Sequence, residues 1–347
     1  MKFNVKLLFW LMILSTASFL ALKAQPISNK NEGITIHWSY KKGLPAPRIQ
    51  GSAVMSNGLF FYIGGRDSRH QKQNIVFKYN LRNDEWNTCA SMPTPRWNFA
   101  STQCQGKIYV IGGDIGISKT EVYDPETDSW ITLPSLPTQR VSAGCIAIND
   151  MVYVIGGWEE DTKPSMKNEV FNIKTQKWER RAPLPSPRMD FGAVLFDGKI
   201  YIFGGTGEIL TKPIDGKGSY FCKPEKTILI YHPQKDLWEK HESEIPIVRI
   251  GTKSVLIDNL IFLLGGYTVD EKRNEYFLTR VDIFDPNRNM WLRGTDMPRK
   301  LLFSGIASLN NSILIIGGWD EHYKATSVVI EGECDLKNRH REKKHET

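Results

Sequence analysis

The stretch PTPRWNFASTQCQGKIYVIGG, residues 93–113, contains the pattern from which the rest of the chain is built. Its end is an apolar run of β-branched and aromatic residues, IYVI, directly before Gly112-Gly113. Such a run bounded by turn residues is typical of a short buried strand. We therefore expect one strand to follow Arg96 and a second, antiparallel strand to end at the glycine pair.

The same pattern recurs along the chain, and internal repetition is the strongest signal in this sequence. Six glycine pairs close apolar runs: Gly64-Gly65, Gly112-Gly113, Gly156-Gly157, Gly204-Gly205, Gly265-Gly266 and Gly317-Gly318. A proline stands 19 residues before every pair: Pro45, Pro93, Pro137, Pro185, Pro246 and Pro298. An arginine stands 16 residues before five of the pairs: Arg48, Arg96, Arg140, Arg188 and Arg249, with Leu301 in the sixth repeat. A tryptophan stands 26 or 27 residues before each pair: Trp38, Trp86, Trp130, Trp178, Trp238 and Trp291.

Each repeat contains four short antiparallel strands by this interpretation. After the glycine pair comes a third strand, then a polar turn such as the Asp-Pro of EVYDPETDSW (121–130), then a fourth strand with the tryptophan. The pairs are spaced 44 to 61 residues apart. This spacing fits one blade of a β-propeller, so the fold class is all-β.

The glycine pair, arginine and tryptophan in this register resemble the kelch repeat. The resemblance covers nearly all of residues 25–336 and implies a six-bladed kelch β-propeller. Trp38 precedes the first complete repeat, and no tryptophan follows Gly318. We therefore predict that the N-terminal strand around Trp38 completes the last blade and closes the ring without exposed strand edges.

Both ends of the chain differ from the repeats. Residues 1–24 combine Lys2 and Lys6 with an apolar stretch and a small residue, Ala24, before Gln25. This arrangement predicts a signal peptide, with an uncleaved anchor as the alternative. It implies export to a periplasmic or extracellular location. Residues 337–347 form a basic tail that we expect to be disordered.

The net charge of +7 comes largely from these two ends. The repeats lack a basic cluster, so we expect no nucleic-acid partner, and no later segment is apolar enough for a membrane helix. Five cysteines, Cys89, Cys104, Cys145, Cys222 and Cys334, show no CxxC spacing. Two alternatives stay open at this point: the cysteines form one or two disulfides, or they are buried free thiols.

Binding candidates come first from the repeated arginines. Arg48, Arg96, Arg140, Arg188 and Arg249 begin the innermost strand of each blade, on the face where longer loops follow the glycine pairs. Residues at this position commonly line the ligand pocket in kelch propellers, so the resemblance implies a partial arginine ring at the channel mouth. Guanidinium groups that converge favour carboxylates or phosphates. The alternative is structural: each arginine pairs with a carboxylate or backbone carbonyl of its own blade.

The loops after the glycine pairs supply the remaining candidates. Variable loops on a rigid scaffold often carry binding residues. The side chains that we single out there are Arg66, Asp67, Trp158, Glu159, Tyr267, Trp319 and Asp320.

No catalytic signature accompanies the repeats. HExxH, GxSxG and Walker sequences are absent from the sequence, and the histidines lack metal-ligand spacing. We therefore expect no cofactor and no metal. Our first hypothesis is a monomeric, exported binding module that holds a protein partner, a carbohydrate or an anionic ligand on its loop-rich face. The alternative is a carbohydrate epimerase or mutarotase, because the kelch fold includes exported sialic acid epimerases.

Overall fold

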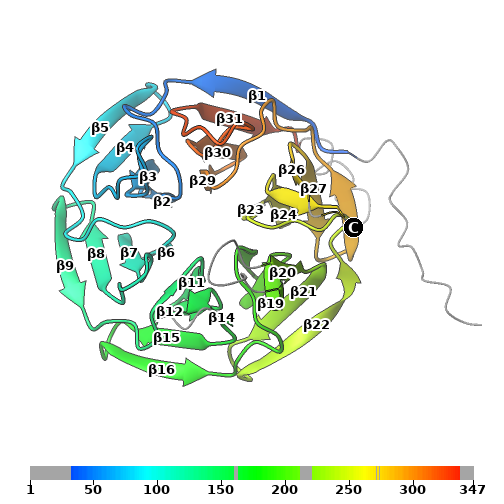
Figure 1. Cartoon of the computed structure of the whole chain (residues 1–347). Coiled ribbons are helices and arrows are strands. Elements are labelled where there is room, and N and C mark those ends of the chain that lie inside the picture. Colours follow the sequence, from blue (N-terminus) through cyan, green and yellow to red (C-terminus); the bar gives the residue numbers. More distant parts are fainter. Residues whose placement is uncertain (1–32, 160–162, 212–220, 271, 273, 337–347) are drawn as a thin grey trace, which may run out of the picture.

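The computed structural model confirms the all-β propeller architecture. It describes residues 33–159, 163–211, 221–270, 272 and 274–336. Within these ranges the chain contains no helix, and its strands form six four-stranded antiparallel sheets arranged around a central axis (Figure 1). The expected signal peptide (1–24) and basic tail (337–347) lie outside the described residues.

The first three sheets follow the chain in order from the axis outward. Blade 1 contains β2 (Ser52–Ser56), β3 (Leu59–Ile63), β4 (Val76–Asn80) and β5 (Glu85–Cys89). Blade 2 contains β6 (Ala100–Cys104), β7 (Lys107–Ile111), β8 (Thr120–Asp124) and β9 (Ser129–Leu133). Blade 3 contains β11 (Gly144–Ile148), β12 (Met151–Ile155), β15 (Asn168–Asn172) and β16 (Lys177–Arg181).

The other three sheets repeat this order. Blade 4 contains β17 (Gly192–Phe196), β18 (Lys199–Phe203), β21 (Thr227–His232) and β22 (Leu237–Glu244). Blade 5 contains β23 (Lys253–Ile257), β24 (Leu260–Leu264), β27 (Val281–Asp285) and β28 (Met290–Arg293). Blade 6 contains β29 (Gly305–Leu309), β30 (Ser312–Ile316), β31 (Val329–Cys334) and β1 (Ile36–Lys41).

Blade 6 joins the two ends of the described chain. Strand β1 is antiparallel to β31, with Trp38 opposite Gly332, and it supplies the outermost strand of the blade (Figure 1). Strand β1 thereby covers the edge of β31, which protects that edge from pairing with another chain.

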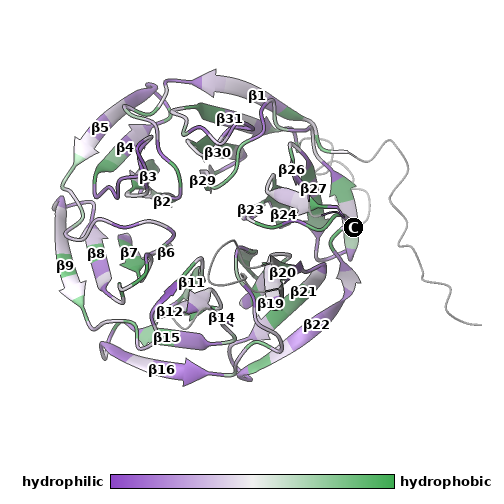
Figure 2. Ribbon diagram, in the orientation of Figure 1, coloured by the Kyte–Doolittle hydropathy of each residue, from purple (hydrophilic) through white to green (hydrophobic). Residues whose placement is uncertain are grey.

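The hydrophobic core is divided among the interfaces between neighbouring blades. One cluster, for example, combines Phe60 and Tyr62 of blade 1 with Leu314 and Ile316 of blade 6, all fully or nearly fully buried. Figure 2 shows hydrophobic residues concentrated on middle strands such as β3 and β7, and hydrophilic residues on outer strands such as β16. Stability therefore depends on each sheet packing against both of its neighbours.

Small hairpins occupy three of the loops after the glycine pairs, where the sequence indicated only irregular segments. They are β13 (Trp158–Glu159) with β14 (Lys163–Pro164), β19 (Thr206–Thr211) with β20 (Phe221–Pro224), and β25 (Tyr267–Val269) with β26 (Glu275–Phe277). The first of them also pairs with β10 (Arg140–Val141). These hairpins stand on one face of the ring, which we call the loop-rich face.

The glycine pairs connect each blade to the next one. The amide of Gly113 donates a hydrogen bond of 3.1 Å to the carbonyl of Arg140, the arginine that begins the following blade. Gly113 has a positive φ of 80°, and a Cβ there would lie 2.5 Å from Cβ of Phe99. Only glycine fits such a position, because the position requires a left-handed backbone and a neighbouring side chain approaches it closely.

A ring of backbone hydrogen bonds surrounds the axis. One residue per blade, two positions after the arginine position, has a positive φ: Gln50, Asn98, Ser142, Asp190, Gly251 and Phe303. Five hydrogen bonds join consecutive members, for example from the amide of Asn98 to the carbonyl of Gln50 at 2.9 Å. We call these six residues the axial ring. It fixes where every innermost strand begins.

At the outer rim, a tryptophan and an aspartate hold the end of the preceding blade. In blade 2 the amide of Ala90 donates to Asp128 at 2.8 Å, and the indole N–H of Trp130 donates to the Ala90 carbonyl at 2.9 Å. The Tyr123 hydroxyl donates to the same carboxylate at 2.6 Å. Asp84 with Trp86 and Asp236 with Trp238 make the corresponding bonds to Lys42 and Ala182.

Blade 3 shows why the aspartate is needed. Trp178 donates to the carbonyl of Pro134 at 2.8 Å, but proline has no N–H to satisfy. The position that holds Asp128 in blade 2 is accordingly Gln176, with a similar positive φ (53° against 49°). Five of the six repeated tryptophans therefore donate to a backbone carbonyl and belong to a clamp between neighbouring blades.

All five cysteines are free thiols in the structure. In the described part of the chain, no helix is long and apolar enough to cross a membrane.

The bonds by which an aspartate and a tryptophan hold the end of the preceding blade, such as Asp128 and Trp130 on Ala90, form what we call the rim clamp. It can be tested against a matched control in the same protein. We expect Asp128→Ala to lower the free energy of unfolding by about 2 kcal/mol, because it removes two hydrogen bonds to a carboxylate. Gln176→Ala makes the same side-chain truncation at a positive φ without removing a clamp, so its cost should stay within about 0.5 kcal/mol. Urea unfolding measures both values. Equal losses in the two variants would show that the clamp does not stabilise the fold.

Acid should weaken the same clamp. Hydrogen bonds from Tyr79 and Tyr123 hold the pKa values of Asp84 and Asp128 below the ordinary aspartate range. The unfolded chain therefore takes up protons first as the pH falls below about 4, and stability falls with it through the folded pKa values. We expect a smaller slope of unfolding free energy against pH below about 4 in Asp128→Asn. Parallel curves for the wild type and the variant would contradict this account.

Candidate functional site

The structure corrects the hypothesis of an arginine ring at the channel mouth. The five side chains are buried, with exposed fractions between 0% and 4%, and they lie inside the blades: Arg48, Arg96, Arg140, Arg188 and Arg249. Their contacts instead follow the structural alternative, in which each arginine pairs with a carboxylate or a backbone carbonyl of its own blade. A guanidinium group buried in this way is unavailable to a ligand on the surface.

Blade 2 illustrates the pairing. The Arg96 guanidinium forms a fully buried ion pair with Glu121 in β8 and donates to the carbonyls of Gly112 and Lys119 at 3.1 and 2.9 Å. Burial lowers the pKa of Arg96, and the neighbouring carboxylate opposes that change. The arginine therefore ties the start of the innermost strand to the third strand of the blade.

The residue opposite the arginine position differs between blades. Arg140 pairs with Glu169 at 2.9 Å and Arg249 pairs with Asp282, both buried. Arg48 instead stacks 5.7 Å above the ring of Phe77. In blade 6, Leu301 belongs to the same apolar cluster as Ile330, so neither partner is charged.

Blade 6, in which both positions are apolar, predicts the outcome of a double substitution in blade 2. We expect Arg96→Leu or Glu121→Ile alone to cost about 3–5 kcal/mol, because each leaves one buried charge unpaired. The double variant Arg96→Leu/Glu121→Ile copies blade 6 and should recover at least half of that loss. Denaturant unfolding of the four proteins measures the coupling. Additive losses would contradict a paired, purely structural role.

Several loop candidates also have structural roles. Asp67 accepts hydrogen bonds from the amides of Arg69 and Gln71 at 2.9 Å, and Asp320 accepts in the same way from His322 and Lys324 at 3.0 Å. These carboxylates order their own loops.

Glu159 and Arg66 are likewise occupied. Glu159 is buried and accepts hydrogen bonds from Ser165 at 2.6 Å and from Lys167 at 3.0 Å. The Arg66 guanidinium lies 3.5 Å from the ring centroid of Trp97. Trp158 is half-buried in β13. Of the loop candidates, Tyr267 and Trp319 lie nearest to the features described next.

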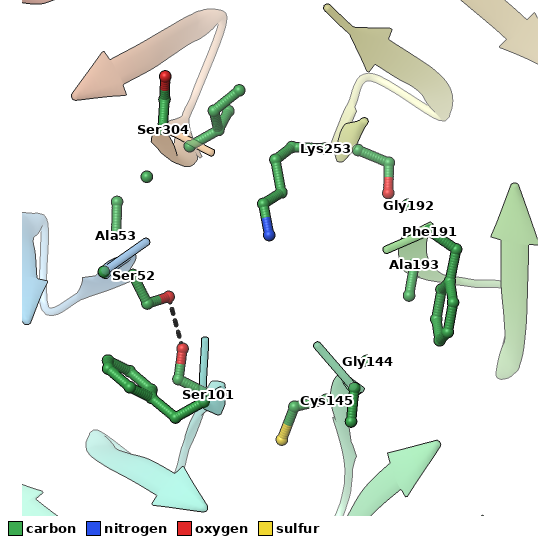
Figure 3. A pocket seen from close by; sticks show the side chains of 16 residues that line it. Ser52, Ala53, Ser101, Gly144, Cys145, Phe191, Gly192, Ala193, Lys253 and Ser304 are labelled. Atoms are coloured by element: carbon green, nitrogen blue, oxygen red, sulfur yellow. Dashed lines mark hydrogen bonds between the residues drawn. The ribbon is translucent and has the colours of Figure 1, made fainter. Parts of the chain in front are cut away.

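The central channel forms a polar cavity of about 160 Å³, lined by the innermost strands (Figure 3). Its wall consists mainly of glycine, alanine and serine, since six strands converge on the axis. The Ser52 and Ser101 hydroxyls are hydrogen-bonded at 2.6 Å. Figure 3 shows the side chain of Lys253 extending into the open centre, with the Cys145 thiol on the wall. Burial raises the pKa of Cys145, so this thiol is protonated and unreactive near neutral pH.

Sequence reasoning missed Lys253, although the repeat contains the necessary signal. Four residues after the arginine position, the other five blades carry Ser52, Ala100, Gly144, Gly192 and Gly305. Lysine is the outlier of that series. Two residues after the arginine position, Asp190 is the only charged member of the axial ring. Aligning the repeats by position would have identified both residues.

Lys253 and Asp190 both line a second, smaller cavity of about 60 Å³ at the loop-rich end of the channel. Desolvation lowers the pKa of Lys253 and raises that of Asp190, and each charge partly offsets the shift of the other. The Asp190 carboxylate also interacts with Ser142. Tyr267 lies close to it, since the Asp190 charge adds to the effect of burial in raising the tyrosine pKa.

Aromatic side chains connect the channel mouth to the loop-rich face of blades 5 and 6. Phe303 of the axial ring contacts Trp319 edge-on, at a centroid distance of 5.7 Å. Trp319 contacts Tyr323 at 6.0 Å, and Tyr323 contacts Phe277 at 5.2 Å. Tyr323 and the neighbouring Tyr276 are exposed, at 53% and 51%. We call Phe277, Phe303, Trp319 and Tyr323, together with Tyr276, the aromatic cluster.

Among the described residues, no group of three or more His, Cys, Asp or Glu side chains could hold a metal ion.

Comparison with known proteins assigns the class. Residues 60–328 match the family described as the Attractin/LZTR1 beta-propeller, and the chain belongs to that family. Together with its kelch-like relatives, this match identifies the protein as a kelch-type β-propeller.

The relatives are larger proteins. Kelch-like protein 36 from Mus musculus is 26% identical over 288 residues, which cover 79% of this chain and 44% of the relative. Kelch-like protein 41a from Danio rerio is 43% identical over 91 residues, which cover 25% of this chain and 15% of the relative. The chain thus matches less than half the length of these relatives. The solved structure of YjhT has a TM-score of 0.69 at 17% identity and covers 83% of this chain and 95% of its own; it supports the fold.

Proposed function

We propose that this protein is a non-catalytic interaction module that binds a protein partner through the loop-rich face of blades 5 and 6. The proposal rests on one observation, the position of the exposed apolar side chains. Among the described residues, five of the eight large exposed hydrophobic residues follow a glycine pair and stand on the loop-rich face: Ile115, Met166, Leu210, Tyr276 and Tyr323. Two of them, Tyr276 and Tyr323, belong to blades 5 and 6, where further aromatic side chains surround them.

The aromatic cluster is suited to a central position in such an interface. Tyrosine and tryptophan are enriched among the residues that dominate binding energy, because they bury a large area at a small entropic cost. The Tyr323 hydroxyl donates to Glu275 at 3.0 Å, which holds the exposed ring in one orientation. The face is thus apolar and partly preorganised, which lowers the cost of binding.

Export of the module is part of the proposal and rests on the leader sequence. A signal peptide at residues 1–24 would place a monomeric propeller in a periplasmic or extracellular compartment. The partner would then be another exported protein or a surface component.

Substitutions at the aromatic cluster test this function. Peptides selected from a random library on the wild-type protein should lose affinity by about tenfold or more on Tyr323→Ser, measured by calorimetry. Tyr40→Ser is the matched control, because Tyr40 is equally exposed, at 62%, but lies on the outer strand β1. Binders that respond to Tyr40→Ser and ignore Tyr323→Ser would place the interface elsewhere and overturn the proposal.

A small anionic or carbohydrate ligand is the second candidate, together with carbohydrate epimerase or mutarotase activity. It is favoured by the channel, where Lys253 and Asp190 face a polar cavity below the aromatic cluster. NMR of freshly dissolved sialic acid tests it. If the purified protein does not accelerate equilibration of the anomers, that substrate is excluded.

A further inference from the structure

One amine and one carboxyl group share the small cavity at the loop-rich end of the channel. Lys253 begins β23 and Asp190 precedes β17, so two neighbouring blades supply them. Both side chains line the cavity, and Figure 3 shows the lysine reaching into the open centre of the channel. The cavity therefore brings a nucleophile and an acid to one place where a small molecule can enter.

Lys253 differs from lysines with a structural role. Lys41 and Lys167 end in ion pairs of 2.8 and 3.0 Å with Glu331 and Glu159. In the described part of the chain, the Lys253 amine forms no ion pair within 4.0 Å. Its side chain remains accessible from the channel although protein surrounds it. The amine is thus placed for a visiting molecule.

The protonation states support reactivity. Desolvation lowers the pKa of Lys253, which increases the fraction of free amine, the form that attacks carbonyl carbon. Desolvation raises the pKa of Asp190, which keeps a proton available at higher pH than for an exposed aspartate. The two shifts match the needs of a nucleophile and a general acid.

The size of the channel limits the substrate. The cavity that Lys253 enters has a volume of about 160 Å³, and the cavity that it shares with Asp190 has a volume of about 60 Å³. The Ser52 and Ser101 hydroxyls offer hydrogen bonds to a polar substituent. The channel therefore suits an aldehyde or ketone of a few heavy atoms.

We propose that Lys253 captures small aldehydes and ketones as an imine, with Asp190 as the proton donor and acceptor. The free amine attacks the carbonyl carbon, forming a C–N bond and breaking the π bond of C=O. The carbinolamine then loses its hydroxyl group as water, with the proton supplied by Asp190. The nitrogen gives up its proton to the resulting carboxylate, so amine and carbonyl compound yield imine and water. No oxidant or reductant takes part.

Reductive trapping tests the proposal. The full-length protein is incubated separately with glycolaldehyde and with pyruvate in the presence of sodium cyanoborohydride, and modified peptides are quantified by mass spectrometry. We expect Lys253 to be labelled about tenfold faster or more than the exposed Lys177 and Lys235, because desolvation lowers its pKa and so increases its fraction of free amine. Equal rates at the three lysines with both probes would overturn the proposal.

Three variants separate the roles. Lys253→Arg keeps the cation and should abolish the fast label. Asp190→Asn keeps a residue that tolerates a positive φ and should slow labelling of Lys253 about tenfold or more. An unchanged rate in Asp190→Asn, with an unchanged thermal unfolding midpoint, would overturn the role of Asp190. Tyr323→Ser should leave labelling intact, so a failure of the partner-binding proposal is distinguishable from a failure of this one.

Discussion

The axial ring of backbone hydrogen bonds is the constraint on which the rest of this propeller depends. Each link joins the start of one innermost strand to the next blade, as from Ser142 to Asn98 at 2.9 Å. Since such strands converge, the channel wall has room mainly for glycine, alanine and serine. The glycine pairs add a second set of links, from Gly113 to Arg140 and its equivalents, while the rim clamp holds the outer edge. The blades are therefore linked at their inner ends and, where the clamp is present, at the outer rim, and packing fills the space between.

Much of the fold could be predicted from the sequence because the repeated residues serve backbone needs that recur in every blade. The glycine pairs mark strand ends, the tryptophans mark outer strands, and the isolated Trp38 indicates a strand that has to pair with the end of the chain. The hairpins after the glycine pairs were not predicted, because each of them occurs in a different length and sequence. A repeat signal contains no information about segments that differ between blades.

The candidate site was harder to predict, for a physical reason. An arginine at a fixed position fits either a ligand ring or a buried ion pair, and the choice depends on the partner strand. Reading Arg96 together with Glu121, or Leu301 together with Ile330, would have favoured the buried pair. Repetition thus indicates a structural role in this chain. We propose that departures from the repeat, such as Lys253 and Asp190 at the axis or Tyr323 in a loop, carry the function of this particular protein.

If repeated residues hold the fold and residues that depart from the repeat carry function, the axis should be rigid and the loop-rich face should be able to adapt to a partner. Hydrogen exchange resolved by residue measures the difference most directly. The amides of Asn98, Ser142 and Gly251 in the axial ring should exchange only through global unfolding. The amides of Arg69, Asn274 and Lys324, which are bonded to loop carboxylates, should exchange through local opening. If the axial amides exchange as fast as the loop amides, the ring does not hold the fold together and the account is wrong.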